Sequence, residues 1–443
     1  MNPGNSQISR EKQPYPTPAG NYRWLVVALL WFLCFFNYAD RQAIFSIFPV
    51  LQTKYHFTKT ELGIIGAAFT WVYAFVAPYA GHVGDRYPRK LVILGGLYVW
   101  SFITGLTAQC TKVWHFVLVR GSEGLGETFY MPASMALISD YHGPATRSRA
   151  IAMHQTSIYA GTIGGSALAG WMAEKYGWQS PFWVLAVAGM TLGIAVYFLV
   201  REPRRNQAEQ HELVASGADA EQPQPMSTFL ASFIRNPTAL GLLVAFFFAN
   251  MVGWVFLTWM PSFLTEKFHL KLAAAGLGAT LFIQLFSVVG AALGGFLADH
   301  WMRSRDTARI LVQAIGVLLG VPFVFLCGYT RSPWLLIVAM SLFGLSKGVY
   351  DSNLTPAFYD VIPASRRSTS TGLMNLLGFI GAGLGQIAIG VAVDHLKVTM
   401  SVAISSTAVI YFGVAAILFL TAAIWARRDI LIARQNAGGT LAP

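Results

Sequence analysis

Long apolar segments, separated by short polar stretches, run through almost the whole chain. A helix that crosses a membrane needs about 20 mainly apolar residues, because the hydrocarbon core is about 30 Å thick and each helical residue rises about 1.5 Å. Twelve segments meet this requirement, and each predicts one transmembrane helix. They cover residues 24–51, 61–82, 90–110, 114–140, 149–173, 180–200, 238–265, 273–298, 308–328, 333–361, 368–395 and 400–426.

A long polar stretch interrupts this pattern between the sixth and seventh segments. The chain is therefore predicted to be an all-α membrane protein with twelve transmembrane helices in two six-helix bundles. Within the polar stretch, the residues MSTFLASFIRN predict a short amphipathic helix. The expected parts are an N-terminal tail (1–23), an N-terminal bundle (24–200), an inter-domain linker (201–237), a C-terminal bundle (238–426) and a C-terminal tail (427–443).

The composition agrees with this interpretation. The 443 residues are 55% hydrophobic and only 12% charged, whereas an ordinary soluble domain has about 25% charged residues. The formal charge of +11 comes without a basic run or an aromatic-interleaved basic patch, so we expect no nucleic-acid partner. Three cysteines, Cys34, Cys110 and Cys327, lie in apolar segments at spacings that suit neither a metal site nor a disulfide framework, and we interpret them as packing residues.

The basic residues indicate which side of the membrane holds the termini. An even number of spans puts both termini on one side, and cytoplasmic loops carry an excess of Lys and Arg. The first apolar segment is also too long for the core of a signal peptide. Both termini are therefore predicted to be cytoplasmic. The basic residues on that side include Arg86, Arg89, Lys90, Arg147, Arg149, Arg201, Arg204, Arg205, Arg303, Arg305, Arg309, Arg366 and Arg367.

The two halves of the chain repeat each other in order, as the parallel repeats of a transporter do. GHVGDRYPRK after span 2 matches GFLADHWMRS after span 8, and EGLGETFY in span 4 matches FGLSKGVY in span 10. Several matches in one order indicate a duplicated architecture. They pair Gly81 with Gly295, Asp85 with Asp299, Arg89 with Arg303, Gly124 with Gly344, Glu127 with Lys347 and Tyr130 with Tyr350.

The pattern G-x-x-x-D-R-x-x-R-K at residues 81–90 resembles the signature of the major facilitator superfamily. NYADR, GLGETFY and VREPRR resemble its Spinster-like branch, while NYADR, TWMPSFL and KYGWQSPFW resemble its organic-anion:cation symporters. The resemblance implies a secondary transporter that works by alternating access. It further implies a monomer in a bacterial inner (plasma) membrane.

The same signature implies a conformational latch, because in that family this loop joins the two halves in the outward-facing state. A short carboxylate such as Asp85 can accept from backbone N–H groups at a helix start, and its basic neighbours can anchor the loop. Alternatively, these charges only follow the positive-inside rule. The predicted latch comprises Gly81, Asp85, Arg86, Arg89, Lys90, Asp299 and Arg303.

Two apolar segments carry charges near mid-membrane. Asp40 and Arg41 are adjacent in span 1, and Arg120, Glu123 and Glu127 share one face of span 4. A charge at the bilayer centre costs at least about 2.5 to 3.5 kcal/mol, so each group must be neutralised, paired or in a water-filled cavity. We predict that Asp40 and Glu127 couple transport to protons and that Arg41 binds a substrate anion. The alternative is a static ion-pair cluster that fixes helix packing.

Other polar residues are candidate substrate contacts. Lys347 and Asp351, at i and i+4 in span 10, either neutralise each other or form the C-terminal half of the site. Arg120 either guides an anion or pairs with Glu123. His154 is either a hydrogen-bonded packing residue or a proton carrier. Neutral candidates for hydrogen bonds to the substrate are Tyr38, Gln284 and Asn375.

Several functional classes are not expected. The glycine runs lie inside apolar helices without a preceding strand, which argues against a nucleotide fold. Neither zinc-ligand spacing nor a nucleophile elbow is present in the sequence, so we predict no enzyme, cofactor or metal. The expected function is proton-coupled transport of a small organic anion, such as a carboxylate or sugar acid. One alternative is a lysophospholipid or another amphiphilic anion, and another is a receptor-like protein, which would not need titrating carboxylates at mid-membrane.

Overall fold

The computed structural model describes residues 21–203, 233–363 and 366–436. Within these ranges every regular element is helical, and ten helices are long and apolar enough to cross a membrane. Residues 1–20 of the predicted N-terminal tail, most of the predicted linker with the first residues of its amphipathic helix, and the last seven residues of the predicted C-terminal tail lie outside the described ranges.

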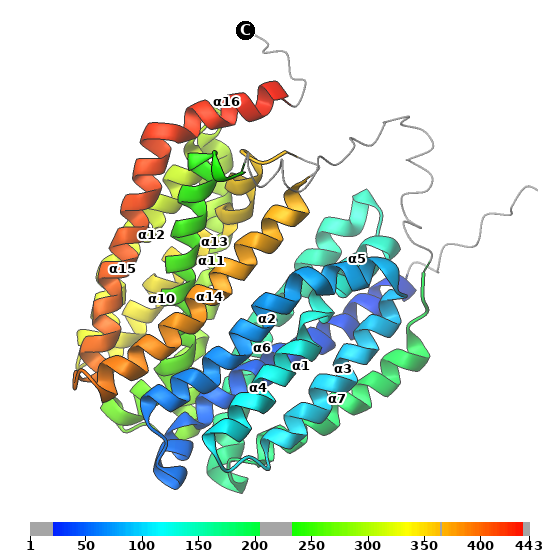
Figure 1. Ribbon diagram of the computed structural model, residues 1–443, viewed down its shortest axis with the longest axis vertical. Helices are drawn as coiled ribbons and strands as arrows, with labels where there is room; N and C mark the ends of the chain where they lie inside the picture. Colours follow the sequence, from blue (N-terminus) through cyan, green and yellow to red (C-terminus); the bar gives the residue numbers. More distant parts are fainter. Residues whose placement is uncertain (1–20, 204–232, 364–365, 437–443) are drawn as a thin grey trace, which may run out of the picture.

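The helices form two bundles that stand side by side (Figure 1). Side-chain caps start several of them: Thr58 forms a capping box on α2, and Asn236 accepts from the N–H of Ala239 at 2.9 Å on α10. The N-terminal bundle contains α1 (Tyr22–Tyr55), α2 (Lys59–Arg86), α3 (Arg89–Thr107), α4 (Val113–Thr128), α5 (Tyr130–Tyr141), α6 (Pro144–Tyr176) and α7 (Ser180–Leu199). The C-terminal bundle contains α10 (Pro237–Phe268), α11 (Leu272–Trp301), α12 (Ala308–Tyr329), α13 (Pro333–Tyr359), α14 (Arg367–Asp394) and α15 (Met400–Thr421), followed by a π-helical turn (Ala422–Ala426) and α16 (Arg427–Asn436).

Two predicted spans are absent from these ten. The predicted fourth span, 114–140, is divided into α4 and α5. Its break has a local cause, because Pro132 has no N–H to bond the carbonyl of Thr128, where α4 ends. The predicted fifth span is the continuous helix α6, whose 33 residues extend about 50 Å but include many polar side chains.

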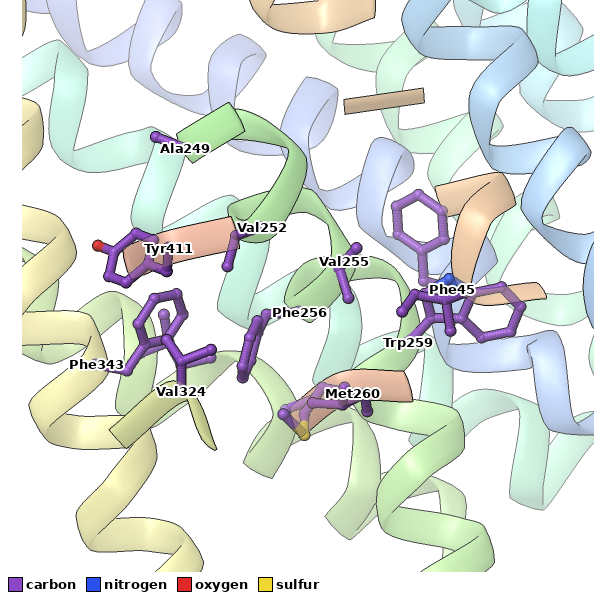
Figure 2. Close-up of a cluster of buried hydrophobic side chains, with 14 of the residues drawn as sticks. Phe45, Ala249, Val252, Val255, Phe256, Trp259, Met260, Val324, Phe343 and Tyr411 are labelled. Carbon is purple, nitrogen blue, oxygen red and sulfur yellow. The ribbon is translucent and has the colours of Figure 1, made fainter. Parts of the chain in front are cut away.

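The largest buried cluster lies around α10, which packs in two directions (Figure 2). On one side Phe256 contacts Phe343 of α13, with ring centroids 4.5 Å apart, and Phe343 contacts Tyr411 of α15 at 5.7 Å. On the other side Trp259 faces α1, where its ring lies 5.8 Å from that of Phe48. One helix therefore belongs both to the C-terminal core and to the contact between the bundles.

The two bundles converge at the end of the molecule opposite α16, which we call the far end (Figure 1). Two matching contacts close it. Asp394, the last residue of α14, accepts a hydrogen bond of 2.6 Å from the backbone N–H of Thr60 at the start of α2. Glu174, near the end of α6, accepts one of 3.3 Å from the N–H of Ala273 at the start of α11. In each case a carboxylate of one bundle caps a helix N-terminus of the other.

Glycines bring the same helices close together beside these caps. A Cβ on Gly390 would overlap the backbone of Lys59, and one on Gly170 would overlap the backbone of Leu272. Both glycines stand four residues before the capping carboxylate. Because the two contacts are related by the internal repeat, we call them the twin clasps. An ion pair between Lys59 and Glu266 adds a further link between the bundles at the far end.

Weakening a clasp should open the far end. Losing one N-cap costs about 1 kcal/mol, so Asp394→Ala or Glu174→Ala should shift the ratio of closed to open molecules about fivefold. Spin labels at Lys54→Cys on α1 and Lys271→Cys beside α11 would report the distance distribution. Asp306→Ala is the control, because Asp306 pairs with Arg434 inside the C-terminal bundle. If both clasp variants give the same spin-label distances as Asp306→Ala, the clasps do not hold the far end closed.

Candidate functional site

A cavity of about 370 Å³ lies between the two bundles. Its wall combines aromatic side chains with ionisable and amide groups, the combination expected of a ligand site. A larger cavity of about 710 Å³ between α11, α12 and α13 is lined almost entirely by apolar side chains and lies away from the mid-membrane charges. The polar lining of the first, which we call the central cavity, consists of Tyr38, Arg41, Gln42, Gln155, Tyr159, Thr162, Asn250, Gln284, Lys347, Tyr350, Asp351 and Tyr411.

Arg41 is held in place on every side except the cavity. Its Nε and Nη2 donate to the same oxygen of Glu127 at 2.9 and 2.7 Å, and Nη2 also donates to Asn37 Oδ1 at 3.1 Å. The guanidinium lies over the rings of Tyr38 and Tyr73, 4.5 and 5.0 Å from their centroids. The Arg41 side chain is 7% exposed, and that of Glu127 is fully buried. Arg41 is thus a fixed cation whose counter-ion lies behind it.

The neighbouring carboxylates occupy the space behind Arg41. Asp40 accepts a hydrogen bond from the Thr104 hydroxyl of α3, while Arg120 forms an ion pair with Glu123 and donates to the Arg41 carbonyl at 3.3 Å. Adjacent residues Asp40 and Arg41 therefore have different partners, as their helical positions require. Arg120 is completely buried, so of the two predicted alternatives the structure shows the pairing with Glu123.

The charges of this buried cluster do not balance. Carboxylate oxygens of Asp40, Glu123 and Glu127 lie within 4.8 Å of one another. Among the described residues, only Arg41 and Arg120 form ion pairs with them. One oxygen of Asp40 and one of Glu127 are buried without a hydrogen-bond partner in the described part of the chain. An uncompensated buried charge is costly, and a single bound proton would restore neutrality. The cluster is therefore suited to bind and release a proton.

A second ion pair faces the cavity from the C-terminal bundle. Lys347 and Asp351 of α13 bond each other one helical turn apart, and their side chains are 27% and 36% exposed. Both residues line the central cavity. The two alternatives given by the sequence are thus both present: the charges neutralise each other and also face the cavity.

Close contact between α1 and α6 sets the position of this cluster. A Cβ on Gly165 would overlap the backbone of Ala39, and one on Gly161 would meet the Phe35 carbonyl. Small residues at such crossings allow helices to approach closely in membranes. The glycine run of α6 therefore fixes the part of α1 that carries Asp40 and Arg41.

Two predicted substrate contacts lie elsewhere. His154 is buried, and its Nε2 donates to the hydroxyl of Tyr130 at 2.9 Å, while that hydroxyl donates to the Leu30 carbonyl. Asn375 is half-buried on α14 and does not line the central cavity. Conversely, Asn250 lines the cavity but was not singled out by the sequence, because a neutral amide in an apolar helix has no distinctive spacing.

The residues of the predicted latch make local contacts within their own bundle. Glu202 accepts from the backbone N–H groups of Arg89 and Lys90, both at 2.7 Å, and so caps α3. The Arg89 side chain forms an ion pair with Asp140. Arg86 and Arg303 are exposed, and Asp299 lies 3.7 Å from Arg309. The side chains of Gly81 and Asp85 lie outside the part that the structure describes.

The ion pair of Arg89 has a repeat-related counterpart. Arg309 at the start of α12 bonds both oxygens of Asp360, at 2.8 and 2.9 Å. Arg309 and Asp360 follow Arg89 and Asp140 by the same number of residues. The sequence match paired Arg89 with Arg303, but in the structure Arg309 occupies the equivalent place. Burial raises the pKa of Asp360, although the nearby Arg309 acts in the opposite direction.

Relatives of this chain match it over most of their length, and a solved structure has a similar fold. It is 27% identical to the probable galactarate/D-glucarate transporter GudP of Bacillus subtilis (strain 168), over 85% of this chain and 88% of the relative. It is 26% identical to the probable L-galactonate transporter of Escherichia coli (strain K12), over 83% and 82%. A crystal structure of a bacterial homolog to the human lysosomal transporter Spinster, inward-facing and unoccupied, covers 94% of this chain and 99% of its own, with a TM-score of 0.75 and 18% identity.

One family model matches most of the chain. The model of the Major Facilitator Superfamily matches residues 30–386, from α1 of the N-terminal bundle to α14 of the C-terminal bundle. Ten described helices can cross a membrane, and curated relatives occur in bacteria. The chain therefore belongs to the major facilitator superfamily and is a multi-pass integral transporter of the bacterial inner membrane.

Proposed function

We propose that this protein is a proton-coupled secondary transporter of a small organic anion, a sugar acid or a related carboxylate, and that it works by alternating access. The observation that carries the proposal is Arg41, a cation on the cavity wall whose counter-ion Glu127 is completely buried behind it. The names of the relatives favour this class, since they are transporters of galactarate, glucarate and galactonate.

Exchange of partners at Arg41 would couple the anion to a proton. An arriving carboxylate binds Arg41 and weakens its bonds to Glu127. Glu127 then has a negative charge in a poorly solvated place and binds a proton, which removes that cost. Asp40 lies in the same cluster and can hold or pass this proton. Binding of the anion thus favours binding of the proton. When either one is released, the other binds less tightly.

The closed far end supports a proposal about the conformational state of the transporter. We propose twelve spans with both termini cytoplasmic, with α4 and α5 together forming the fourth span and α6 the fifth. The twin clasps then close the extracytoplasmic side, and the structure corresponds to an inward-facing state. The predicted latch around Asp85 would form only in the outward-facing state, when the cytoplasmic ends of the bundles approach each other.

An amphiphilic anion is the second candidate. The specific observation in its favour is the aromatic part of the cavity wall, which includes Phe246, Trp254, Phe343 and Phe379. The likeness to the Spinster homolog concerns the fold alone at 18% identity. A lysophospholipid included as a competitor in every transport assay separates the two candidates.

Replacing Glu127 should uncouple the transporter. In liposomes with an imposed pH gradient, Glu127→Gln should lower gradient-driven uptake of a sugar acid at least about tenfold, a typical loss when a positioned proton-transfer group is removed. Exchange of the acid between the two sides without a gradient should continue, because Arg41 remains. Glu61→Gln is the control, since glutamine can replace glutamate in the capping box of α2. Gradient-driven uptake that survives in Glu127→Gln would contradict the coupling.

Replacing Arg41 should weaken anion binding. A charge-assisted hydrogen bond contributes about 1.5 to 3 kcal/mol, so Arg41→Lys, which loses the planar fork but keeps the charge, should raise the Kd of the acid about 10- to 100-fold. Titration calorimetry on the purified protein measures this directly. Lys175→Arg at the far end of α6 is a control for a change between the same two residue types. An unchanged Kd in Arg41→Lys would exclude Arg41 as the anion contact.

A further inference from the structure

The central cavity has two cations on its wall, one from each bundle. Arg41 belongs to α1 and Lys347 to α13. Each is paired with a carboxylate, Arg41 with Glu127 and Lys347 with Asp351. The cavity between the bundles is thus bounded by two ion pairs, and the proposed function uses only one of them.

The two ion pairs differ in accessibility. Lys347 is 27% exposed and Asp351 36% exposed, whereas Arg41 is 7% exposed and Glu127 not at all. A partly solvated ion pair contributes little to stability and can exchange its partner readily. Lys347 is therefore the cation that an incoming anion reaches with less competition.

We propose that Lys347 binds a second carboxylate of the substrate, so that the transporter prefers sugar acids with a carboxylate at each end over those with only one. This inference rests on the proposed function and specifies its substrate class. One end of the diacid binds Arg41 of the N-terminal bundle, and the other end binds Lys347 of the C-terminal bundle.

The rest of the wall suits the hydroxylated chain between two such carboxylates. Amide side chains of Gln42, Gln155 and Asn250 line the cavity, together with the phenol of Tyr159. Amides and phenols both donate and accept hydrogen bonds, as successive hydroxyl groups require. A volume of about 370 Å³ is at the small end of ligand pockets, which favours a compact polar acid over a lipid.

Partner exchange takes place at both ends of the substrate. The first carboxylate displaces Glu127 from Arg41, and the second displaces Asp351 from Lys347. Asp351 is partly exposed, so water can solvate it after the exchange, whereas Glu127 is fully buried and needs a proton. A diacid is therefore held by two cations and a monoacid by one.

The surroundings of Asp351 support this exchange. The groups that face it are Lys347 and Tyr350 from its own helix, Tyr159 from α6 and Tyr411 from α15. Phenols carry no charge near neutral pH. Lys347 is therefore the one cation that faces Asp351 among the described residues, and its capture by substrate leaves the carboxylate without a counter-ion.

The experiment compares two acids that differ by one carboxylate. Galactarate and galactonate are taken up by the full-length protein in liposomes, and the Kd of each is measured by calorimetry. In Lys347→Met, galactarate affinity should fall at least about tenfold more than galactonate affinity, as expected for one charge-assisted contact. Lys54→Met, which removes an exposed lysine at the far end, should leave the ratio of the two affinities at the wild-type value.

A second variant avoids an unpaired carboxylate. Lys347→Met combined with Asp351→Asn removes both charges, so no carboxylate is left without its cation. Galactarate affinity should again fall at least about tenfold more than galactonate affinity.

The outcomes separate a failure of the role of Lys347 from a failure of the proposed function. A similar affinity loss for both acids, or none for either, would overturn the role of Lys347. Both results leave the sugar-acid transporter intact. A wild-type protein that binds and transports neither acid would instead refute the proposed function, and this inference with it.

Discussion

The buried ion pair between Arg41 and Glu127 is the constraint on which the rest of the structure depends. Two nitrogens of the guanidinium bond a single carboxylate oxygen, and the other oxygen of Glu127 has no partner in the described part of the chain. Breaking such a pair from one side would leave an uncompensated charge, at a cost of about 3 to 5 kcal/mol. The pair can therefore open only when another anion takes Arg41 or a proton reaches Glu127, and that condition links the two events.

The helices around this pair restrict its freedom to move. Glycines of α6 bring that helix against α1 at the level of Ala39, one residue before Asp40. Thr104 of α3 donates to Asp40, and Arg120 of α4 bonds the backbone of Arg41. Charges on two helices, α1 and α4, are thus held by a hydroxyl of a third helix and by a backbone contact. A site preorganised in this way requires little rearrangement when an anion binds.

The sequence revealed the charged part of the site because charge in a membrane is expensive. Asp40, Arg41 and Glu127 were predicted from their depth together with the family resemblance, and the structure brings all three into one cluster. Asn250 was not found, since a neutral amide costs far less than a charge. The clasp carboxylates Glu174 and Asp394 were missed for another reason: acids near the ends of helices are common, and only the fold shows that their partners belong to the other bundle.

The fold was more predictable than its details. Hydrophobic segments located the long helices. The break between α4 and α5 was not predicted, because it depends on one missing hydrogen bond at Pro132. The repeat was also read correctly in outline, although its alignment placed Arg303 opposite Arg89. The structure gives that position to Arg309, because ion pairing with Asp360 matches the pairing of Arg89 with Asp140. At this position the ion pair shows the internal repeat more clearly than the sequence alignment does.

Symmetry and asymmetry are divided between the ends and the centre of the molecule. At the far end the twin clasps repeat the same contact, a carboxylate four residues after a glycine that caps a helix of the other bundle. At the centre, the repeat places Lys347 where the first half has Glu127. The two clasps make equivalent contacts, one from each bundle. At the centre, the opposite charges of Glu127 and Lys347 give the two bundles different binding chemistry. In the proposed mechanism, the duplicated fold keeps symmetric contacts at the far end, while one half binds the proton and both halves bind the anion.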